Sequence, residues 1–158
     1  MRGTPMPLRH PARLLATWFG AGLSPIAPGT AGSLAALPFA VGFAWIGGTA
    51  LLAFCTVLAL LAGIWASNAV VRTSGSRDPG EIVIDEVAGQ WLALTFLPLD
   101  LLAYVLGFAL FRAFDIVKPW PASWIDREMH GGLGIMLDDI IAGGYAGILL
   151  YFLLPYLP

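Results

Sequence analysis

The stretch VAGQWLALTFLPLDLLAYVLGFALF, residues 87–111, decides how this chain folds. Its side chains are almost all apolar, and Asp100 is the only charged one. Since a helix of about 20 apolar residues crosses a bilayer, the stretch is long enough for one membrane span. The turn residues in LPLD, at 97–100, instead favour two short helices that fold back on each other.

The composition of the whole chain is typical of a membrane protein. Hydrophobic residues make up 58% of the 158 positions and charged residues only 11%, whereas a soluble domain carries about 25% charged residues. Further apolar runs lie at 31–47, 49–71 and 140–157. We therefore expect one domain, residues 1–158, folded as an all-α integral membrane bundle with about four to five membrane helices and a short hairpin near Pro98.

The positions of the charges separate the two topologies. The first two apolar runs form a hairpin across Gly47 and Gly48, so the basic residues before and after that hairpin share one side. A fold-back at Pro98 brings the third basic segment to the same side, as the positive-inside rule favours. A single span across 87–111 is the alternative, and it would put that segment on the opposite side. The three basic segments are Arg2, Arg9 and Arg13; Arg72 and Arg77; and Arg112, Lys118 and Arg127.

The fold-back also gathers the acidic side chains on the basic side. Of the 10 Asp and Glu residues, Asp100 alone lies at the far turn. We expect the charged side to be the working face, in contact with the cytoplasm. Residues 1–30 are expected to form a basic interfacial segment, with Trp18 and Phe19 at the level of the lipid headgroups.

Two acidic doublets stand at the starts of predicted helices: Asp85 with Glu86, and Asp138 with Asp139. For either doublet alone, capping of a helix N-terminus is as good an explanation as a functional site. Capping does not explain Asp115, which closes the intervening helix at an end where the helix dipole disfavours an anion. Because these acids repel one another, they predict a bound cation. Ligands that are all oxygen atoms favour Mg²⁺, although this ligand type does not exclude Ca²⁺.

Two further segments indicate anion binding. In SPIAPGTAGSLAALP, residues 24–38, Thr30 and Ser33 follow a turn at a helix start, where free N–H groups attract anions. A plain N-cap explains that stretch alone more simply. FRAFDIVKPWPASWIDREMHGG, residues 111–132, interleaves acidic and basic side chains, although an aromatic belt with basic anchors explains part of it. The charged candidates in this segment are Arg112, Asp115, Lys118, Asp126 and Arg127.

The combination of a hard metal, cations and a helix start at a membrane face predicts a phosphorylated lipid headgroup as the ligand. The single cysteine, Cys55, lies inside an apolar run, and the sequence contains neither D-x-D nor S-G-H. These absences disfavour covalent phosphoenzyme routes and favour direct attack of activated water on phosphorus. The net charge of −2 and the lack of a basic tail give no sign of nucleic-acid binding.

Four motifs, in this order, resemble the phosphatidylglycerophosphatase A family of bacteria: GLSPIAPGTAGSLAALP, IVIDEVAGQW, FRAFDIVKPWP and WIDREMHGGLGIMLDDIIAG. The resemblance covers about residues 14–157. It implies an all-helical, Mg²⁺-dependent, multi-pass enzyme of the bacterial inner (cytoplasmic) membrane. Such an enzyme converts phosphatidylglycerophosphate into phosphatidylglycerol and phosphate. The positions that it implies as functional are Thr30, Ser33, Asp85, Glu86, Asp115, Lys118, Asp126, Arg127, Asp138 and Asp139.

We assign roles to these positions as hypotheses. The expected metal ligands are Asp85, Glu86, Asp115, Asp138 and Asp139. One carboxylate among Asp85, Glu86, Asp115 and Asp139 acts on the attacking water. The expected phosphate-binding residues are Thr30, Ser33, Arg112, Lys118, Asp126 and Arg127, with Arg112 placed at the inner phosphodiester.

Other functions compete with this one. An ion transporter or channel would use the acids as a path, but it would need them inside the spans rather than at one edge. A membrane scaffold would tolerate neutralisation of the acids one by one. Within the enzyme class, a lipid phosphatase or phosphotransferase could act on another headgroup. The sequence leaves open the number of ions and the oligomeric state.

Overall fold

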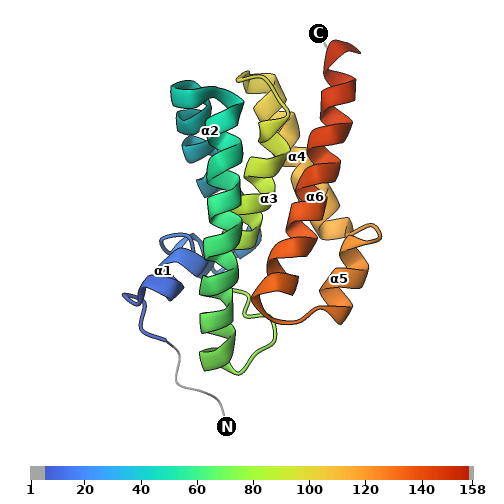
Figure 1. Ribbon diagram of the computed structural model, residues 1–158. Coiled ribbons are helices and arrows are strands. Elements are labelled where there is room, and N and C mark those ends of the chain that lie inside the picture. Colours follow the sequence, from blue (N-terminus) through green and yellow to red (C-terminus); the bar gives the residue numbers. More distant parts are fainter. Residues whose placement is uncertain (1–5, 157–158) are drawn as a thin grey trace.

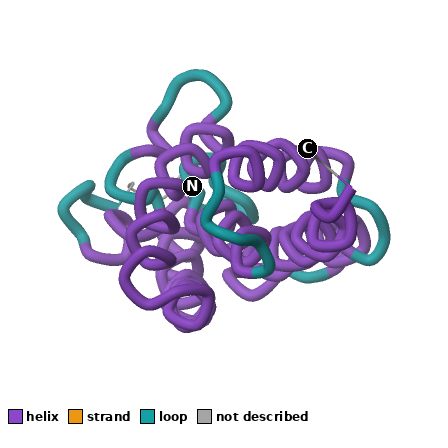
Figure 2. The backbone as a smooth tube through the Cα atoms, turned by 90° about the horizontal axis from the view of Figure 1, so that it is seen from above, coloured by secondary structure: helices purple, strands orange, loops and turns teal. Residues whose placement is uncertain are grey.

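Helices and short connections make up residues 6–156, the part of the chain that the structure describes, and no strand occurs there (Figures 1 and 2). This computed structural model therefore confirms the all-α prediction. The elements are α1 (Pro11–Ala16), a 3-10 turn (Ala21–Leu23), α2 (Pro28–Ser74), α3 (Ile84–Thr95), α4 (Leu101–Val117), α5 (Ala122–Glu128), α6 (Gly131–Leu153) and a second 3-10 turn (Leu154–Tyr156).

Helix α2 consists of two arms that meet at a pair of glycines. The backbone leaves the helical region at Gly47 and at Gly48, whose φ of 64° combined with a ψ of −163° suits only glycine. Phe43 and Cys55, on opposite sides of this break, line the same apolar pocket. The second arm therefore runs back along the first, as the sequence predicts.

The chain also reverses at Pro98. Helix α3 has 12 residues and α4 has 17, so at 1.5 Å per residue the two arms are about 18 and 25 Å long. Asp100 caps α4 by accepting a hydrogen bond from the Ala103 N–H at 3.0 Å. At the other end of the pair, Arg112 of α4 lies 4.0 Å from Glu86 of α3. These contacts confirm the hairpin and exclude a single span across 87–111.

Helix α6 begins earlier than the sequence suggests. It begins at Gly131, so Asp138 and Asp139 lie two turns inside the helix. The expectation that this doublet opens the last helix is wrong, and capping no longer explains it. The first turn of α6 is held by Asn68 of α2, whose side-chain oxygen accepts the Gly132 N–H at 2.8 Å. A Cβ on Gly132 would lie 2.3 Å from the backbone oxygen of Ile64, so this glycine allows close approach rather than breaking the helix.

The N-terminal segment packs against the bundle. Trp18 is only 8% exposed, and its ring meets that of Trp91 edge-on, with 5.4 Å between centroids. The Trp91 N–H in turn donates to the Ala36 carbonyl at 2.9 Å. Trp18 is therefore packed inside the protein, whereas Phe19 is 60% exposed, and the level of this segment relative to the lipid headgroups stays a prediction.

The outer surface is suited to lipid. Helix α2 and the segment Gly131–Tyr156 are each long and apolar enough to cross a membrane. Large apolar side chains are exposed on both, among them Trp45, Phe54, Leu61, Ile148 and Phe152. Apolar exposure of this extent marks a membrane or protein contact surface. In contrast, α3 is almost entirely buried, because α2, α4 and α6 all pack against it.

Helices α3 and α6 approach each other closely along a row of small residues. A Cβ on Gly143 would lie 2.2 Å from the Gly89 carbonyl oxygen, and one on Gly147 would lie 2.8 Å from the Ala93 oxygen. A Cβ on Gly89 would lie 2.6 Å from the backbone carbonyl oxygen of Asp139. Side chains spaced by four residues share one face of a helix. We call these facing positions, 89 and 93 on α3 and 139, 143 and 147 on α6, the glycine seam.

The glycine seam sets the positions of two carboxylates. One turn before Gly89 on α3 is Asp85, and one turn before Gly143 on α6 is Asp139. The two helices run side by side in the same direction (Figure 1). The packing of small residues therefore brings Asp85 and Asp139 to the same level of the bundle.

Replacement of Gly143 tests the seam. In Gly143→Ala the new methyl group meets backbone that cannot move aside, so overpacking should cost about 1–3 kcal/mol of stability. Gly144→Ala is the matched control, because nothing lies within 4 Å of its Cβ position. There, the better helix propensity of alanine should stabilise the protein by up to about 1 kcal/mol. Thermal unfolding in detergent measures both, and equal shifts for the two variants would contradict the seam.

Candidate functional site

A cavity of about 510 Å³ lies at the end of the bundle where α3 and α6 begin and α4 ends. The N-terminus of α2, the loop before α3, and α5 complete its wall. Charged and titratable side chains dominate the lining: Arg77, Asp78, Asp85, Glu86, Asp115, Lys118, Asp126, Arg127, His130, Asp138 and Asp139. The fold therefore brings together most of the site residues that the sequence predicts.

Three carboxylates form a cluster in this cavity. Asp85, Glu86 and Asp139 each place one oxygen within 4.8 Å of the others. One buried oxygen of each, and also Oδ1 of Asp138, has no hydrogen-bond donor among the described residues. Burying unpartnered anionic oxygens is costly, so the cluster needs a cation or a shared proton. An all-oxygen donor set of this kind fits Mg²⁺.

The start of α3 aims the two members of its doublet in different directions. Adjacent helical residues point about 100° apart. Asp85 lies on the side of the glycine seam, toward α6. Glu86 faces the N-terminus of α2, where a Cβ on Gly29 would lie only 2.2 Å from its Oε1. Gly29 is therefore small because the backbone of α2 touches this carboxylate.

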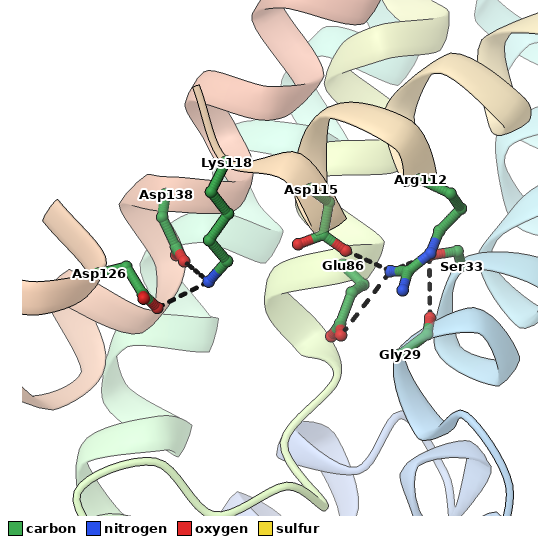
Figure 3. Close-up of polar contacts among 8 residues, drawn as sticks. All are labelled: Gly29, Ser33, Glu86, Arg112, Asp115, Lys118, Asp126 and Asp138. Atoms are coloured by element: carbon green, nitrogen blue, oxygen red, sulfur yellow. Dashed lines mark hydrogen bonds and ion pairs between the residues drawn. The ribbon is translucent and has the colours of Figure 1, made fainter. Parts of the chain in front are cut away.

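Arg112 is held by acidic residues rather than free in the cavity (Figure 3). Its guanidinium forms an ion pair with Asp115 and lies 4.0 Å from Glu86. It also lies 3.5 Å from the Ser33 hydroxyl, which donates to the Gly29 carbonyl at 2.9 Å. Arg112 thus joins α4, α3 and α2 around the site. Asp115 lines the same cavity but is not part of the three-oxygen cluster.

Lys118 connects two elements of the wall (Figure 3). Its ammonium donates to Asp126 of α5 at 2.7 Å and to Asp138 of α6 at 2.5 Å. Burial alone would lower the pKa of this lysine, but the hydrogen bonds and charges of the two acids outweigh burial, so its pKa is raised. The ammonium therefore stays protonated. Arg127, in the last turn of α5, also lines the cavity.

The predicted helix-start subsite has a different composition from the one expected. Pro28 and Gly29, at the start of α2, line the cavity, whereas Thr30, Ser33 and Arg112 are not among its lining residues. The part of this subsite that lines the cavity is therefore the first two residues of α2 rather than the predicted hydroxyl groups. The substrate-binding roles of the three side chains stay predictions.

Several residues that shape the site were not singled out from the sequence. Arg13 forms a two-pronged ion pair with Glu81, at 3.1 and 2.7 Å, and this pair fixes the loop before α3. Asn68 holds the start of α6, and a single amide in a long apolar run was a signal for it. Gln90 is fully buried one turn after Glu86, and its amide has no partner among residues 6–156. No local pattern could pair Arg13 with Glu81, which are 68 positions apart in the sequence.

Comparison with known proteins adds independent information. The family model for phosphatidylglycerophosphatase A matches residues 14–154. The phosphatidylglycerophosphatase A of Escherichia coli (strain K12) is 43% identical over 147 residues, which cover 92% of this chain and 85% of that protein. The protein of the same name in Haemophilus influenzae is 39% identical over 145 residues, covering 91% and 89%.

A relative with another name is equally similar. A protein of Bacteroides thetaiotaomicron, provisionally named a phosphatidylinositol-3-phosphatase, is 43% identical over 149 residues, covering 87% of this chain and 89% of the relative. No solved structure matches the chain. The matched region contains α2 to α6 and every charged side chain of the cavity. By this extended match, and by its charged cavity, the chain belongs to the phosphatidylglycerophosphatase A family and is a phosphatase.

Proposed function

We propose that this protein hydrolyses the terminal phosphate monoester of phosphatidylglycerophosphate in a Mg²⁺-dependent reaction. The products are phosphatidylglycerol and inorganic phosphate. The observation that carries the proposal is the cluster of Asp85, Glu86 and Asp139, whose unpartnered oxygens face a cavity that also contains Lys118 and Arg127. The names of two relatives support the choice of headgroup.

The cluster is the proposed place of the metal ion. Asp85, Glu86 and Asp139 would hold it, and Asp138 offers a further unpartnered oxygen beside the one bound to Lys118. A divalent cation there supplies positive charge against the phosphate oxygens and makes water more acidic. Without a cation, the like charges of the cluster would oppose both folding and the approach of an anionic substrate.

The remaining side chains bind the phosphate and the water. Lys118 and Arg127 present positive charge to the phosphate, and the start of α2 at Gly29 adds the positive end of a helix dipole. Asp115 lines the cavity outside the three-oxygen cluster, so we assign it to hold and deprotonate the attacking water. Arg112 orients Asp115 through their ion pair.

The proposed setting is the cytoplasmic face of a bacterial inner membrane, with several crossings. Trp120, which is 76% exposed, and Trp124 lie in and just after the link between α4 and α5, beside the cavity. Tryptophans of this kind favour the headgroup region. This placement puts the cavity at the depth of a lipid phosphate. It also leaves the acids at one end of the bundle, which disfavours an ion path along the helices.

Phosphate release from defined lipids tests the function. Purified protein in detergent should release phosphate from phosphatidylglycerophosphate with Mg²⁺, and release should stop with EDTA and return when Mg²⁺ is restored. Phosphatidate and phosphatidylinositol 3-phosphate serve as competing headgroups. Faster release from either of these lipids would overturn the substrate assignment. Undiminished release in EDTA would overturn the requirement for a metal ion.

Neutralising Asp139 should separate activity from stability. Asp139→Asn removes a buried, unpartnered charge, so the melting temperature should stay the same or rise. The loss of several kcal/mol of transition-state stabilisation should lower kcat by about a thousandfold. The control is Asp100→Asn at the far end of the bundle, where asparagine is an equally good N-cap. Near-normal turnover by Asp139→Asn would remove this residue from the site.

Replacement of Lys118 should affect binding. Lys118→Met removes a charged donor worth about 1.5–3 kcal/mol, so KM for the lipid should rise by roughly 10- to 100-fold. Lys118→Arg keeps the charge and should retain most of the affinity. Because methionine also leaves Asp138 unpaired, melting temperatures of both variants must accompany the kinetics. An unchanged KM in a folded Lys118→Met protein would contradict the phosphate-binding role.

A further inference from the structure

A second cavity, of about 430 Å³, lies on the outside of the bundle between α4 and α6. We call it the α4–α6 groove. Its wall consists of Phe114, Pro119, Tyr145, Ile148, Leu149 and Phe152. The Tyr145 hydroxyl donates to the Trp120 carbonyl at 2.9 Å. With that hydroxyl satisfied, the groove presents apolar surface.

The wall of the groove adjoins the wall of the charged cavity along the chain. Phe114 and Pro119 in its wall are the chain neighbours of Asp115 and Lys118, which line the cavity. On α6, Asp138, Tyr145 and Phe152 are spaced by seven residues, so they lie on one stripe of the helix. The groove therefore has Pro119, the chain neighbour of Lys118, at one end, and on α6 it begins at Tyr145, two turns after Asp138, and runs away from the charged end.

The dimensions and exposure of the groove fit a hydrocarbon chain. The turns of α6 from Tyr145 to Phe152 rise about 10 Å. The hydrocarbon of one leaflet is about 15 Å deep, half of the usual core thickness. Ile148 is 51% exposed, so the groove is open along its side and a chain can enter laterally from the bilayer.

We propose that the α4–α6 groove holds one acyl chain of the phospholipid substrate while its phosphate monoester occupies the charged cavity. This inference rests on the proposed function and adds how the substrate is oriented. A lipid tail is as apolar as the groove, so transfer from bilayer to groove supplies little affinity. The groove instead aligns the lipid, because a chain seated there fixes the direction from which the headgroup meets the carboxylates.

Filling the groove tests the alignment. Ile148→Trp occupies the groove with a larger side chain. The matched control is Leu61→Trp, which makes a similar change on the outer face of α2 at a position that is 60% exposed. Phosphate release is measured with dioleoyl and dibutanoyl forms of phosphatidylglycerophosphate. Ile148→Trp should lower kcat/KM about tenfold for the dioleoyl lipid and leave the dibutanoyl lipid unaffected, because its chains end near the start of the groove. Leu61→Trp should change neither.

Two results of this assay would overturn the proposal. One is unchanged kcat/KM of Ile148→Trp on the dioleoyl lipid. The other is an equal loss on both lipids, which indicates general damage to the site. Melting temperatures of both variants identify a folding defect, and in that case Leu149→Trp provides the same test at the neighbouring wall position.

Photo-crosslinking gives a readout that does not need turnover. Wild-type protein is irradiated with phosphatidylglycerophosphate that carries a diazirine on one acyl chain. Labelling should concentrate on residues 145–152 relative to residues 54–61 of α2, and excess unlabelled substrate should suppress it. Equal labelling of residues 145–152 and residues 54–61 would overturn the proposal that the groove holds an acyl chain. Wild-type protein that labels at the groove but releases no phosphate would instead overturn the proposed function alone.

Discussion

The close packing of α3 on α6 is the constraint on which the site depends. Carboxylates repel one another, so nothing in their own chemistry brings Asp85 and Asp139 together. The glycine seam supplies the missing attraction, because small residues let two backbones approach and gain dispersion contacts along their length. Each acid lies on the same stripe as the seam, with its glycine one turn further along. The acids are thus held at short range by helices that are rigid for reasons of packing alone.

The charged end divides into acids with protein partners and acids without them. Asp115 is paired with Arg112, and Lys118 is shared by Asp126 and Asp138. The Lys118 pairs connect the end of α4 with α5 and α6 and so build one wall of the cavity. Asp85 and Asp139 have no basic partner among the described residues, and both belong to the three-oxygen cluster. Within the cluster, only Glu86 lies near a basic side chain, Arg112 at 4.0 Å, so most of the negative charge of the cluster has no protein cation from residues 6–156 to balance it.

Local chemistry and charge placement were sufficient for the topology, and tertiary packing accounts for what they missed. The reversal at Pro98 follows from turn residues and from the distribution of basic residues, both of which are visible in the sequence. The start of α6 was misplaced because the glycines of MHGGLG resemble helix breakers, although they allow contact with Ile64 and Met129. The burial of Trp18 against Trp91 could not be predicted, because interfacial and core tryptophans have the same local pattern. Apart from Asp78, the acidic residues of the cavity were all predicted from the sequence, but their separation into paired and unpaired groups depends on distances that no spacing encodes.

The shortness of α3 has a consequence for the membrane around the protein. A helix of about 18 Å falls well short of a hydrocarbon core of about 30 Å. A lipid-facing helix of that length would suffer hydrophobic mismatch and thin the bilayer. Here the deficit carries no such penalty, because neighbouring helices rather than lipid surround α3. Under the proposed function, a lipid phosphate would therefore reach the start of α3 between protein walls, and the surrounding leaflet would not have to thin around this short helix.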